Sequence, residues 1–517
     1  MVSDRYSVLV NDHEFLGESV LDEKSVLYFR EDERLTLKSQ NISSAMVQDS
    51  LDGLVALGKS KDGFVKHALR RPVWLKILKS RLSIDANNVS ESEKGLSEFV
   101  THKDEHQVSL DVKRSFGDIK DDVAKSFLRQ ALEQTITKVL RRFPQLNYYQ
   151  GYHDVVAVFV LVFMHTHKAD EEAELSDSTS GTPSTDGSDY HETLSSSSIS
   201  TKLADDSVLF IDSDQLFESV MIFTLLYLRD FMMSSLAFTI DQLVLIPLIV
   251  KDKDPRFYRT FQLNEIDPFF ALSSVLTLFS HDLRPQSNES LSIVFQIFDL
   301  VISSNSMMVP LTVYSNLLLA KKDDLLTRLK DNLDNFENDT DLIHGVIQQE
   351  MIVGSSVQLW NEVLETTRIA NSSSFPNAKK TVNKYSVLLT ASHVPTTIDQ
   401  ALSWLAKETR LNEMRSSLES VNNKAKTPSP AISRWRLIAR SAGPNLIKMS
   451  LFIGVAAILM KLYLRSLEGH QVYPQIALKS YLDQLKSLKF SGLNQSRRIW
   501  LDPLKNLLKN IGRPSRS

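Results

Sequence analysis

An uninterrupted run of ten apolar residues, Val155 to Met164, directly follows a polar, turn-prone segment. So apolar a run must be buried, because the removal of apolar surface from water is the main force that drives folding. The preceding letters, RFPQLNYYQGYHD, contain a helix-breaking proline, a tyrosine pair, a glutamine and a glycine. The simplest interpretation of these letters is a loop that enters a buried element. The valines favour a strand for that element, whereas the neighbouring patterns favour a helix, so its residues alone leave both open.

The surrounding sequence is patterned as helix. From Val123 to Phe143, apolar residues recur at helical spacing, and Pro144 ends the pattern. Apolar helical runs follow at 216–232, 267–283 and 291–304, and a further helix opens on a capping box of Thr397 and Gln400. Alternating strand signals bounded by Asn-Gly or Asp-Gly turns are not found. We expect Asp154, just before the apolar run, to cap the following helix or to bond locally.

The composition changes abruptly between Ala169 and Ser207. This stretch contains ten acidic residues, sixteen serines or threonines and a single lysine. Such a segment cannot bury enough apolar surface to offset the conformational entropy lost on folding, so the sequence predicts a disordered insert. The insert is either a solvated spacer or a phosphorylation-rich regulatory loop.

The C-terminal part of the chain differs again. From Leu446 to Leu464 there are only two charges, Lys448 and Lys461, placed where their stems can reach a membrane interface. The uncharged core, Met449 to Met460, is short enough to suit a buried helix of a soluble domain as well. We favour a membrane anchor, because basic clusters flank the segment. The tail, residues 465–517, has a basic amphipathic pattern that suits a membrane surface or a partner helix.

Composition excludes several kinds of chemistry. The 517 residues include no cysteine, which excludes disulfides, thiolate nucleophiles, iron–sulfur clusters and Cys-ligated zinc. His165 and His167 would point to different faces of a helix and have no third ligand near them, so we predict no metal site. The formal charge of −4 gives no global reason to expect nucleic acid. The N-terminal letters do not form a secretory signal, which favours the cytosol for the bulk of the chain.

Three short motifs contain residues that could carry chemistry. Arg70 stands four residues before Trp74, and Asp111 stands three residues before Arg114. At this spacing the Asp111 carboxylate can orient the guanidinium, although such a pair taken alone is most often an ordinary surface ion pair. The third motif, Y-x-Q-G, spans Tyr148 to Gly151.

In this order and spacing, R-x-x-x-W, V-x-x-D-x-x-R and Y-x-Q-G resemble the motifs of the TBC family of Rab GTPase-activating proteins, with valine where isoleucine is usual. The letters QLNYYQGYHD, with FFALSSVLTLFSHDL and IFDLVI downstream, are most similar to the endoplasmic-reticulum-anchored subgroup of that family, whose members also carry a C-terminal apolar segment. The resemblance covers roughly residues 50 to 407. It implies an all-α fold, in which a two-lobed helical TBC domain carries a disordered acidic insert and a C-terminal membrane-anchor helix. By the same resemblance, the valine-rich run is a helix.

The implied organisation has five parts. They are an N-terminal extension (1–49), a TBC domain (50–410) that contains the insert (169–207), a basic linker (411–445), a membrane-anchor segment (446–464) and the basic tail (465–517).

The resemblance also implies which residues act. Arg114 matches the position of an arginine finger, whose planar and always charged guanidinium stabilises charge on phosphoryl oxygens during GTP hydrolysis. Gln150 matches a glutamine finger, whose amide can position the attacking water. Ser115 stands where threonine is commoner in the family. Supporting roles are implied for four further residues. Asp111 would brace Arg114, Tyr148 would pack beneath the glutamine turn, Gly151 would permit close backbone approach to the partner, and Trp74 would fill the core.

The implied partner is a Rab-family GTPase in its GTP-bound form. The partner would carry the GTP and Mg²⁺, so the chain would need no cofactor of its own and would act as an activator without independent turnover. The resemblance places it on the endoplasmic reticulum membrane, with the catalytic domain facing the cytosol, as a regulator of traffic to the Golgi. A catalytically silent Rab-binding scaffold and a membrane tether are the alternatives. The presence of both Arg114 and Gln150 favours the activator, because binding alone needs neither finger.

Overall fold

The computed structural model describes residues 23–83, 100–168, 198–203, 207–285, 289–333, 340–351, 355–370, 378–391 and 395–424. The predicted membrane-anchor segment and basic tail lie outside these residues. So do most of the predicted acidic insert and the first part of the predicted N-terminal extension.

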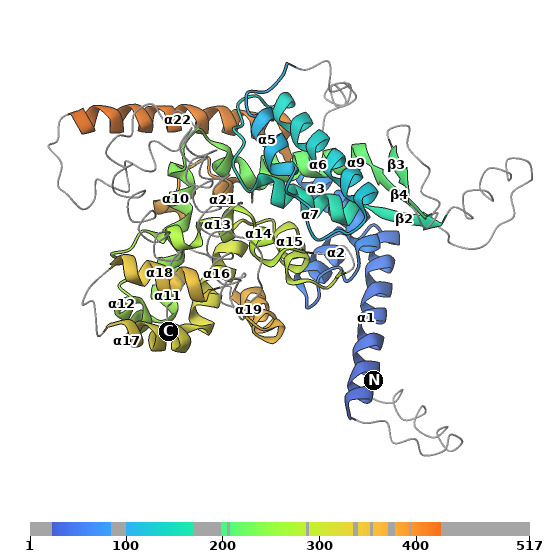
Figure 1. The fold of residues 1–517 in the computed structure, drawn as a ribbon, viewed down its shortest axis with the longest axis horizontal. Coiled ribbons are helices and arrows are strands. Elements are labelled where there is room, and N and C mark those ends of the chain that lie inside the picture. Colours follow the sequence, from blue (N-terminus) through green and yellow to red (C-terminus); the bar gives the residue numbers. More distant parts are fainter. Residues whose placement is uncertain are drawn as a thin grey trace, which may run out of the picture. The chain divides into compact units, whose positions relative to one another are not determined.

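Helices dominate the described chain, as the sequence predicts (Figure 1). In the first half they are α1 (Glu23–Val47), α2 (Leu51–Lys59), α3 (His67–Arg81), α5 (Glu105–Val112), α6 (Asp122–Arg142), α7 (Tyr152–Phe163) and α9 (Ser213–Phe223). A π-helical turn η2 (Thr224–Leu228) and a 3₁₀ turn η3 (Arg229–Met232) then precede α10 (Ala237–Leu243), α11 (Leu245–Lys253), α12 (Pro255–Thr260), η4 (Pro268–Ala271), α13 (Leu272–Leu276), α14 (Ser280–Leu283) and α15 (Ile293–Ser304). The last group is α16 (Met308–Ala320), α17 (Lys322–Leu333), α18 (Thr340–Glu350), α19 (Val357–Ala370), α20 (Ala378–Thr381), α21 (Val387–Thr390) and α22 (Ile398–Lys424).

In the described part of the chain, two small sheets correct the prediction of an all-α fold. Strands β2 (His165–Lys168) and β3 (Ser198–Lys202) pair with opposite edges of β4 (Ser207–Asp212), both antiparallel to it. A second, parallel pair joins β1 (Leu82–Ser83) to β5 (Thr396–Thr397). The predicted disorder of residues 169–207 is wrong for β3, because these polar residues are ordered by backbone pairing rather than by side-chain burial. His165 and His167 lie on a strand, so the helix-face argument used for them does not apply.

The amphipathic pattern from Val123 to Phe143 forms α6, and Pro144 follows its end as predicted. Asp121 caps its first turn by accepting a hydrogen bond from the Ala124 backbone N–H at 2.7 Å. The valine-rich run forms α7, and most of its side chains are buried. Tertiary burial therefore overrides the strand preference of valine there, which confirms the helix implied by the family resemblance.

A buried carboxylate joins α15 to the start of α3. Asp299 is fully buried on α15 and accepts hydrogen bonds from the Trp74 indole at 2.7 Å and from the Phe64 backbone N–H at 2.9 Å. It also forms an ion pair with Arg70 at 2.9 Å. Trp74 fills the core as predicted, and its ring contacts that of Phe159 on α7. The R-x-x-x-W motif is thus a structural unit in this molecule. We call Asp299 and its three partners, Phe64, Arg70 and Trp74, the Asp299 cluster.

Helix α22 is held by polar contacts along one face. The Thr397 hydroxyl accepts the Gln400 backbone N–H at 3.1 Å, as the predicted capping box requires. Further along, the buried Glu408 pairs with the buried Arg229 at 3.2 Å. Arg415 donates to Asp241 at 2.6 Å. The helix continues to Lys424, so the predicted linker, 411–445, begins inside it.

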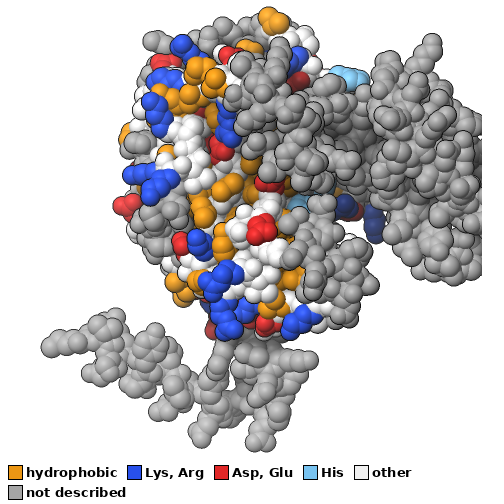
Figure 2. All heavy atoms as spheres, turned by 90° about the vertical axis from the view of Figure 1, so that its left-hand side faces the viewer, with side chains coloured by type: hydrophobic (Ala, Val, Ile, Leu, Met, Phe, Trp, Pro, Cys, Tyr) orange, Lys and Arg blue, Asp and Glu red, His pale blue; other side chains and the backbone are white. Residues whose placement is uncertain are grey.

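Among the described residues, no single helix is both long and apolar enough to cross a membrane. One bent pair, 213–232 with 237–253, meets the length and composition test across a 97° bend. On the face shown in Figure 2, basic side chains are interspersed with acidic and apolar ones and form no continuous field of one charge.

Candidate functional site

Arg114 lies in a turn directly after α5. This turn, residues 113–118, is called the arginine turn below. The backbone N–H groups of Arg114 and Ser115 bond back to the carbonyls of Asp111 and Val112, and Phe116 adopts a positive φ of 57° that reverses the chain. Arg129 of α6 donates from Nε to the Ser115 carbonyl at 3.0 Å. The turn is therefore fastened to α6, while the Arg114 side chain remains 53% exposed.

The Asp111 carboxylate orients Arg114. It is almost fully buried and accepts a hydrogen bond from Arg114 Nη2 on Oδ1. The same oxygen accepts a bond from Gln107 at 3.0 Å, and Oδ2 accepts the Tyr148 hydroxyl at 2.8 Å. This arrangement matches the bracing role implied for Asp111, because the carboxylate is itself fixed on both oxygens.

Gln150 lies at the exposed end of a segment that is fixed along its length. The segment, residues 143–151, is called the glutamine turn. It is held by hydrogen bonds of 2.8–3.1 Å to neighbouring elements. His102 bonds to the Leu146 carbonyl, and the Asn147 N–H donates to the Met232 carbonyl. The Tyr148 N–H donates to Asp104, and the Tyr149 hydroxyl donates to the Leu276 carbonyl. Gln150 itself is exposed, and in the part of the chain described here its side-chain amide has no hydrogen-bond partner. The fold thus presents one amide on a rigid support.

Gly151 is required inside this chain. It is buried, adopts a φ of +115° and stands at the N-cap of α7. A Cβ at this position would lie 2.8 Å from Thr277 Cγ2. The glycine therefore allows close approach inside this chain, where the turn meets the segment between α13 and α14.

Tyr148 likewise does more than pack beneath the turn. Its hydroxyl bonds to Asp111 and lies 3.1 Å from His153 Nδ1. Burial raises the pKa of Tyr148 well above its usual value, and the nearby Asp111 carboxylate adds to the effect. The hydroxyl therefore remains protonated and can donate to Asp111. Tyr148, which belongs to the glutamine turn, thereby contacts Asp111, which supports Arg114 in the arginine turn.

A histidine and carboxylate pair lies next to these turns and was not predicted. Asp154 caps no helix. Instead its Oδ2 contacts His281 Nδ1 of α14 at 2.9 Å, and its Oδ1 lies 3.4 Å from His153 Nε2. The bond to Asp154 raises the pKa of His281, although partial burial opposes it. Burial opposes ionisation of Asp154, but its hydrogen bond to His281 and the nearby charges of His281 and Arg114 outweigh burial and lower the pKa of Asp154. Spacing could not reveal this pair, since 127 positions separate the two residues.

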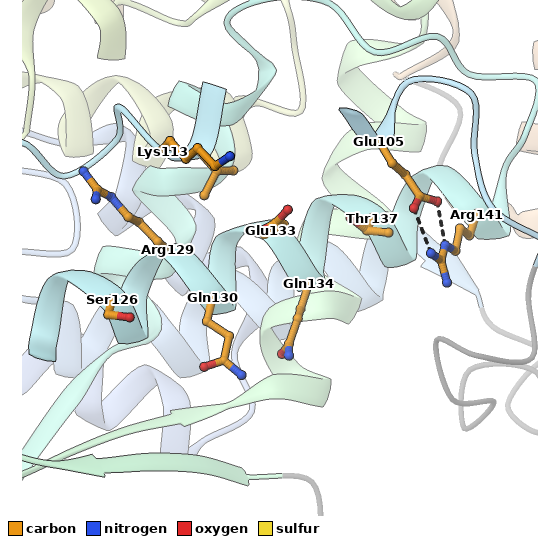
Figure 3. A pocket seen from close by; sticks show the side chains of 10 residues that line it. Glu105, Lys113, Ser126, Arg129, Gln130, Glu133, Gln134, Thr137 and Arg141 are labelled. Atoms are coloured by element: carbon orange, nitrogen blue, oxygen red, sulfur yellow. Dashed lines mark hydrogen bonds and ion pairs between the residues drawn. The ribbon is translucent and has the colours of Figure 1, made fainter. Parts of the chain in front are cut away.

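A surface groove of about 460 Å³ flanks the arginine turn between α5 and α6. Figure 3 shows Lys113 and Arg129 near each other at one end, and the ion pair of Glu105 with Arg141 at the other. That pair is bidentate, at 2.6 and 2.8 Å, and the bond from Arg141 lowers the pKa of Glu105. Glu133 lies between the two ends. Basic, acidic and amide side chains alternate in the lining, so its charge favours no single class of ligand.

The helical fold and the two turns joined through Tyr148 and Asp111 define a domain of the Rab-GTPase-TBC class. The family model of the Rab-GTPase-TBC domain matches residues 67–326. The chain belongs to this family. It is 36% identical over 496 residues to the GTPase-activating protein GYP8 of Saccharomyces cerevisiae, across 93% of this chain and 92% of that protein. It is 25% identical over 355 residues to the GTPase-activating protein gyp10 of Schizosaccharomyces pombe, across 67% of this chain and 76% of that protein.

A shorter match joins the chain to human TBC1 domain family member 20. The two are 37% identical over 131 residues, which is 24% of this chain and 31% of the human protein. Among solved structures, the Ypt/Rab-GAP domain of Gyp1p is similar at a TM-score of 0.40 and 17% identity, across 62% of this chain and 93% of that structure.

Proposed function

We propose that this chain activates GTP hydrolysis by a Rab-family GTPase in its GTP-bound form, with Arg114 and Gln150 supplied in trans. Membership of the Rab-GTPase-TBC family and similarity to two yeast GTPase-activating proteins support the class of activity. The observation that carries the residue assignment is that an exposed arginine and an exposed glutamine stand on two fixed turns joined through Tyr148 and Asp111.

Arg114 can serve the reaction without leaving its brace. The bond to Asp111 uses Nη2, so the N–H groups on Nε and Nη1 are available to phosphoryl oxygens. Charge that develops on those oxygens in the transition state would be stabilised by a guanidinium that is already oriented. An arginine supplied by a partner in this way accelerates hydrolysis by roughly 10³- to 10⁵-fold in small GTPases.

Gln150 would position the attacking water. Its carbonyl oxygen accepts a hydrogen bond from the water while its amide donates to the γ-phosphate. The GTP and Mg²⁺ belong to the partner GTPase, so this chain contributes side chains and no cofactor. It acts as an activator and has no turnover of its own.

We further propose that the chain works on the endoplasmic reticulum membrane, with the helical domain in the cytosol, and regulates vesicle traffic to the Golgi. This proposal is supported by the motif resemblance and by the apolar segment from Leu446 to Leu464.

Single-turnover GTP hydrolysis by a panel of purified Rabs tests the activity. We expect the wild-type chain to stimulate at least one Rab, and Arg114→Ala and Arg114→Lys to lose that stimulation by about 10³-fold or more, because lysine keeps the charge but lacks the planar fork. Gln150→Ala should lose nearly as much while GTP-loaded Rab still binds, since water positioning acts in the transition state. A scaffold would bind Rab and stimulate none. Full stimulation by either single variant across the panel would contradict the two-finger mechanism.

A further inference from the structure

His153 lies where the supports of the two turns meet. Its imidazole, on the first turn of α7, is 6% exposed. Nδ1 lies 3.1 Å from the Tyr148 hydroxyl and 3.7 Å from Asp111 Oδ2. Nε2 faces Asp154, which His281 holds from the other side. Among the described residues, each polar partner of this ring is therefore Tyr148 or Asp111, which support Arg114, or Asp154, which pairs with His281.

The direction of the hydrogen bond between Tyr148 and His153 follows from the number of protons on the Tyr148 hydroxyl. The Tyr148 hydroxyl has one proton, and it donates this proton to Asp111 at 2.8 Å. Its oxygen can then only accept from His153, which requires the proton of the neutral imidazole to be on Nδ1. Burial lowers the pKa of His153, which is consistent with a neutral ring. A bond from Nδ1–H thus fixes the direction of the Tyr148 hydroxyl.

We propose that His153 is a positioning residue for both fingers, an inference that rests on the proposed function. Its Nδ1–H directs the Tyr148 hydroxyl toward Asp111, and Asp111 in turn orients Arg114. Tyr148 precedes Gln150 by two residues, so the same bond holds the base of the glutamine turn. His153 touches no reacting atom, and its effect passes through Tyr148.

Packing alone gives no reason for an imidazole here. Burial of a polar ring costs free energy that an apolar ring of similar size would not lose. Among the described residues, the hydrogen bond of this ring goes to Tyr148, so its chemistry is used by the site.

The test compares His153→Phe with His153→Asn and Tyr148→Phe in multiple-turnover assays on a Rab that the wild-type chain stimulates. We expect His153→Phe to lower kcat by about tenfold or more and to change KM by less than about twofold, because only the transition state needs an oriented Arg114. His153→Asn should recover kcat to within about threefold of the wild type, since its carboxamide can donate from near the place of Nδ1. Tyr314→Phe, which removes a buried hydroxyl bond to the Phe270 carbonyl elsewhere in the core, is the matched control and should keep kcat unchanged.

A double variant separates positioning from general destabilisation. His153 acts through Tyr148, so the double variant Tyr148→Phe/His153→Phe should lower kcat no more than Tyr148→Phe does alone. Multiplicative losses, or an asparagine variant as impaired as the phenylalanine variant, would overturn the inference. If His153→Phe does not fold, the comparison of Tyr148→Phe with His153→Asn still tests it, because only the former breaks the bond. Unchanged kcat in His153→Phe, beside a loss in Arg114→Ala, overturns the inference alone, whereas a wild-type chain that stimulates no Rab overturns the proposed function as well.

Discussion

At the residue scale, Gly151 controls how the glutamine turn enters α7. Substitution by alanine would strain the backbone at φ +115° and bring Cβ to 2.8 Å from Thr277 Cγ2. We expect Gly151→Ala to lower the free energy of unfolding by about 2–4 kcal/mol, as urea denaturation would measure it.

Two further variants test this explanation. Gly345→Ala is the matched control, because a Cβ there meets nothing within 4 Å, and it should be neutral or slightly stabilising. Thr277→Ser removes the methyl group that the new Cβ would meet, so it should recover part of the loss but not the backbone strain. A Gly151→Ala variant as stable as the wild type would contradict the role assigned to this glycine.

The Asp154–His281 pair predicts a pH dependence of stability. The pKa of His281 is higher in the folded chain than in the unfolded one, so its contribution is fully present below about pH 6.5 and is lost as pH rises through the raised pKa. The pKa of Asp154 is lower in the folded chain, so its contribution is present above about pH 4 and is lost as pH falls through the lowered pKa. His281→Gln should therefore destabilise the chain more at pH 5.5 than at pH 8.5 in urea denaturation. An equal loss at both values would show that charge on His281 does not stabilise the fold.

At the scale of single elements, the sequence predicts what depends on local pattern. The spacing of apolar residues and Pro144 predict α6, and Thr397 with Gln400 predicts the start of α22. The pattern could not predict β3, because its serines and threonines pair with β4 through their backbone and leave no alternating apolar signal. The bonds from Tyr148 to Asp111 and from Asp154 to His281 are not visible in the sequence for another reason, since they depend on how distant elements pack.

The sheet also sets the limits within which the acidic insert can be shortened. Strands β2 and β3 run parallel on either side of β4, so Lys168 and Ser198 lie at opposite ends of the sheet, roughly 20 Å apart. A Gly/Ser linker of about twelve residues spans that distance. We expect replacement of residues 171–196 by such a linker to leave stimulated hydrolysis within about threefold of the wild type and the melting temperature nearly unchanged.

The control for this experiment combines the linker with a substitution that disrupts the pairing of β3. Ile199→Pro within β3 removes a backbone donor from the pairing with β4, and it should lower the melting temperature where the linker does not. A large loss of activity or stability from the linker alone would show that the replaced residues dock on the helical domain.

At the scale of the whole molecule, the proposed anchor and the described domain should separate cleanly. A chain that ends at Ser441 keeps every described residue, because these end at Lys424. We expect it to be soluble and to stimulate Rab in solution as the full chain does, but to lose membrane attachment in cells. The full chain should resist carbonate extraction from membranes. Release by carbonate would leave only peripheral binding by the basic tail, as a segment that lies on the bilayer would show.

The Asp299 cluster also has a consequence for synthesis. Arg70 and Trp74 are made early, but the carboxylate that neutralises one and accepts from the other lies 229 and 225 positions further along. At about 5–20 residues per second, the ribosome needs roughly 10–45 s to reach it. Throughout that interval Arg70 and Trp74, which the finished domain buries completely, lack the Asp299 carboxylate as a partner. Nascent chains should therefore depend on chaperones until α15 has emerged, and messages truncated before it should yield protein that is degraded rather than a stable N-terminal fragment.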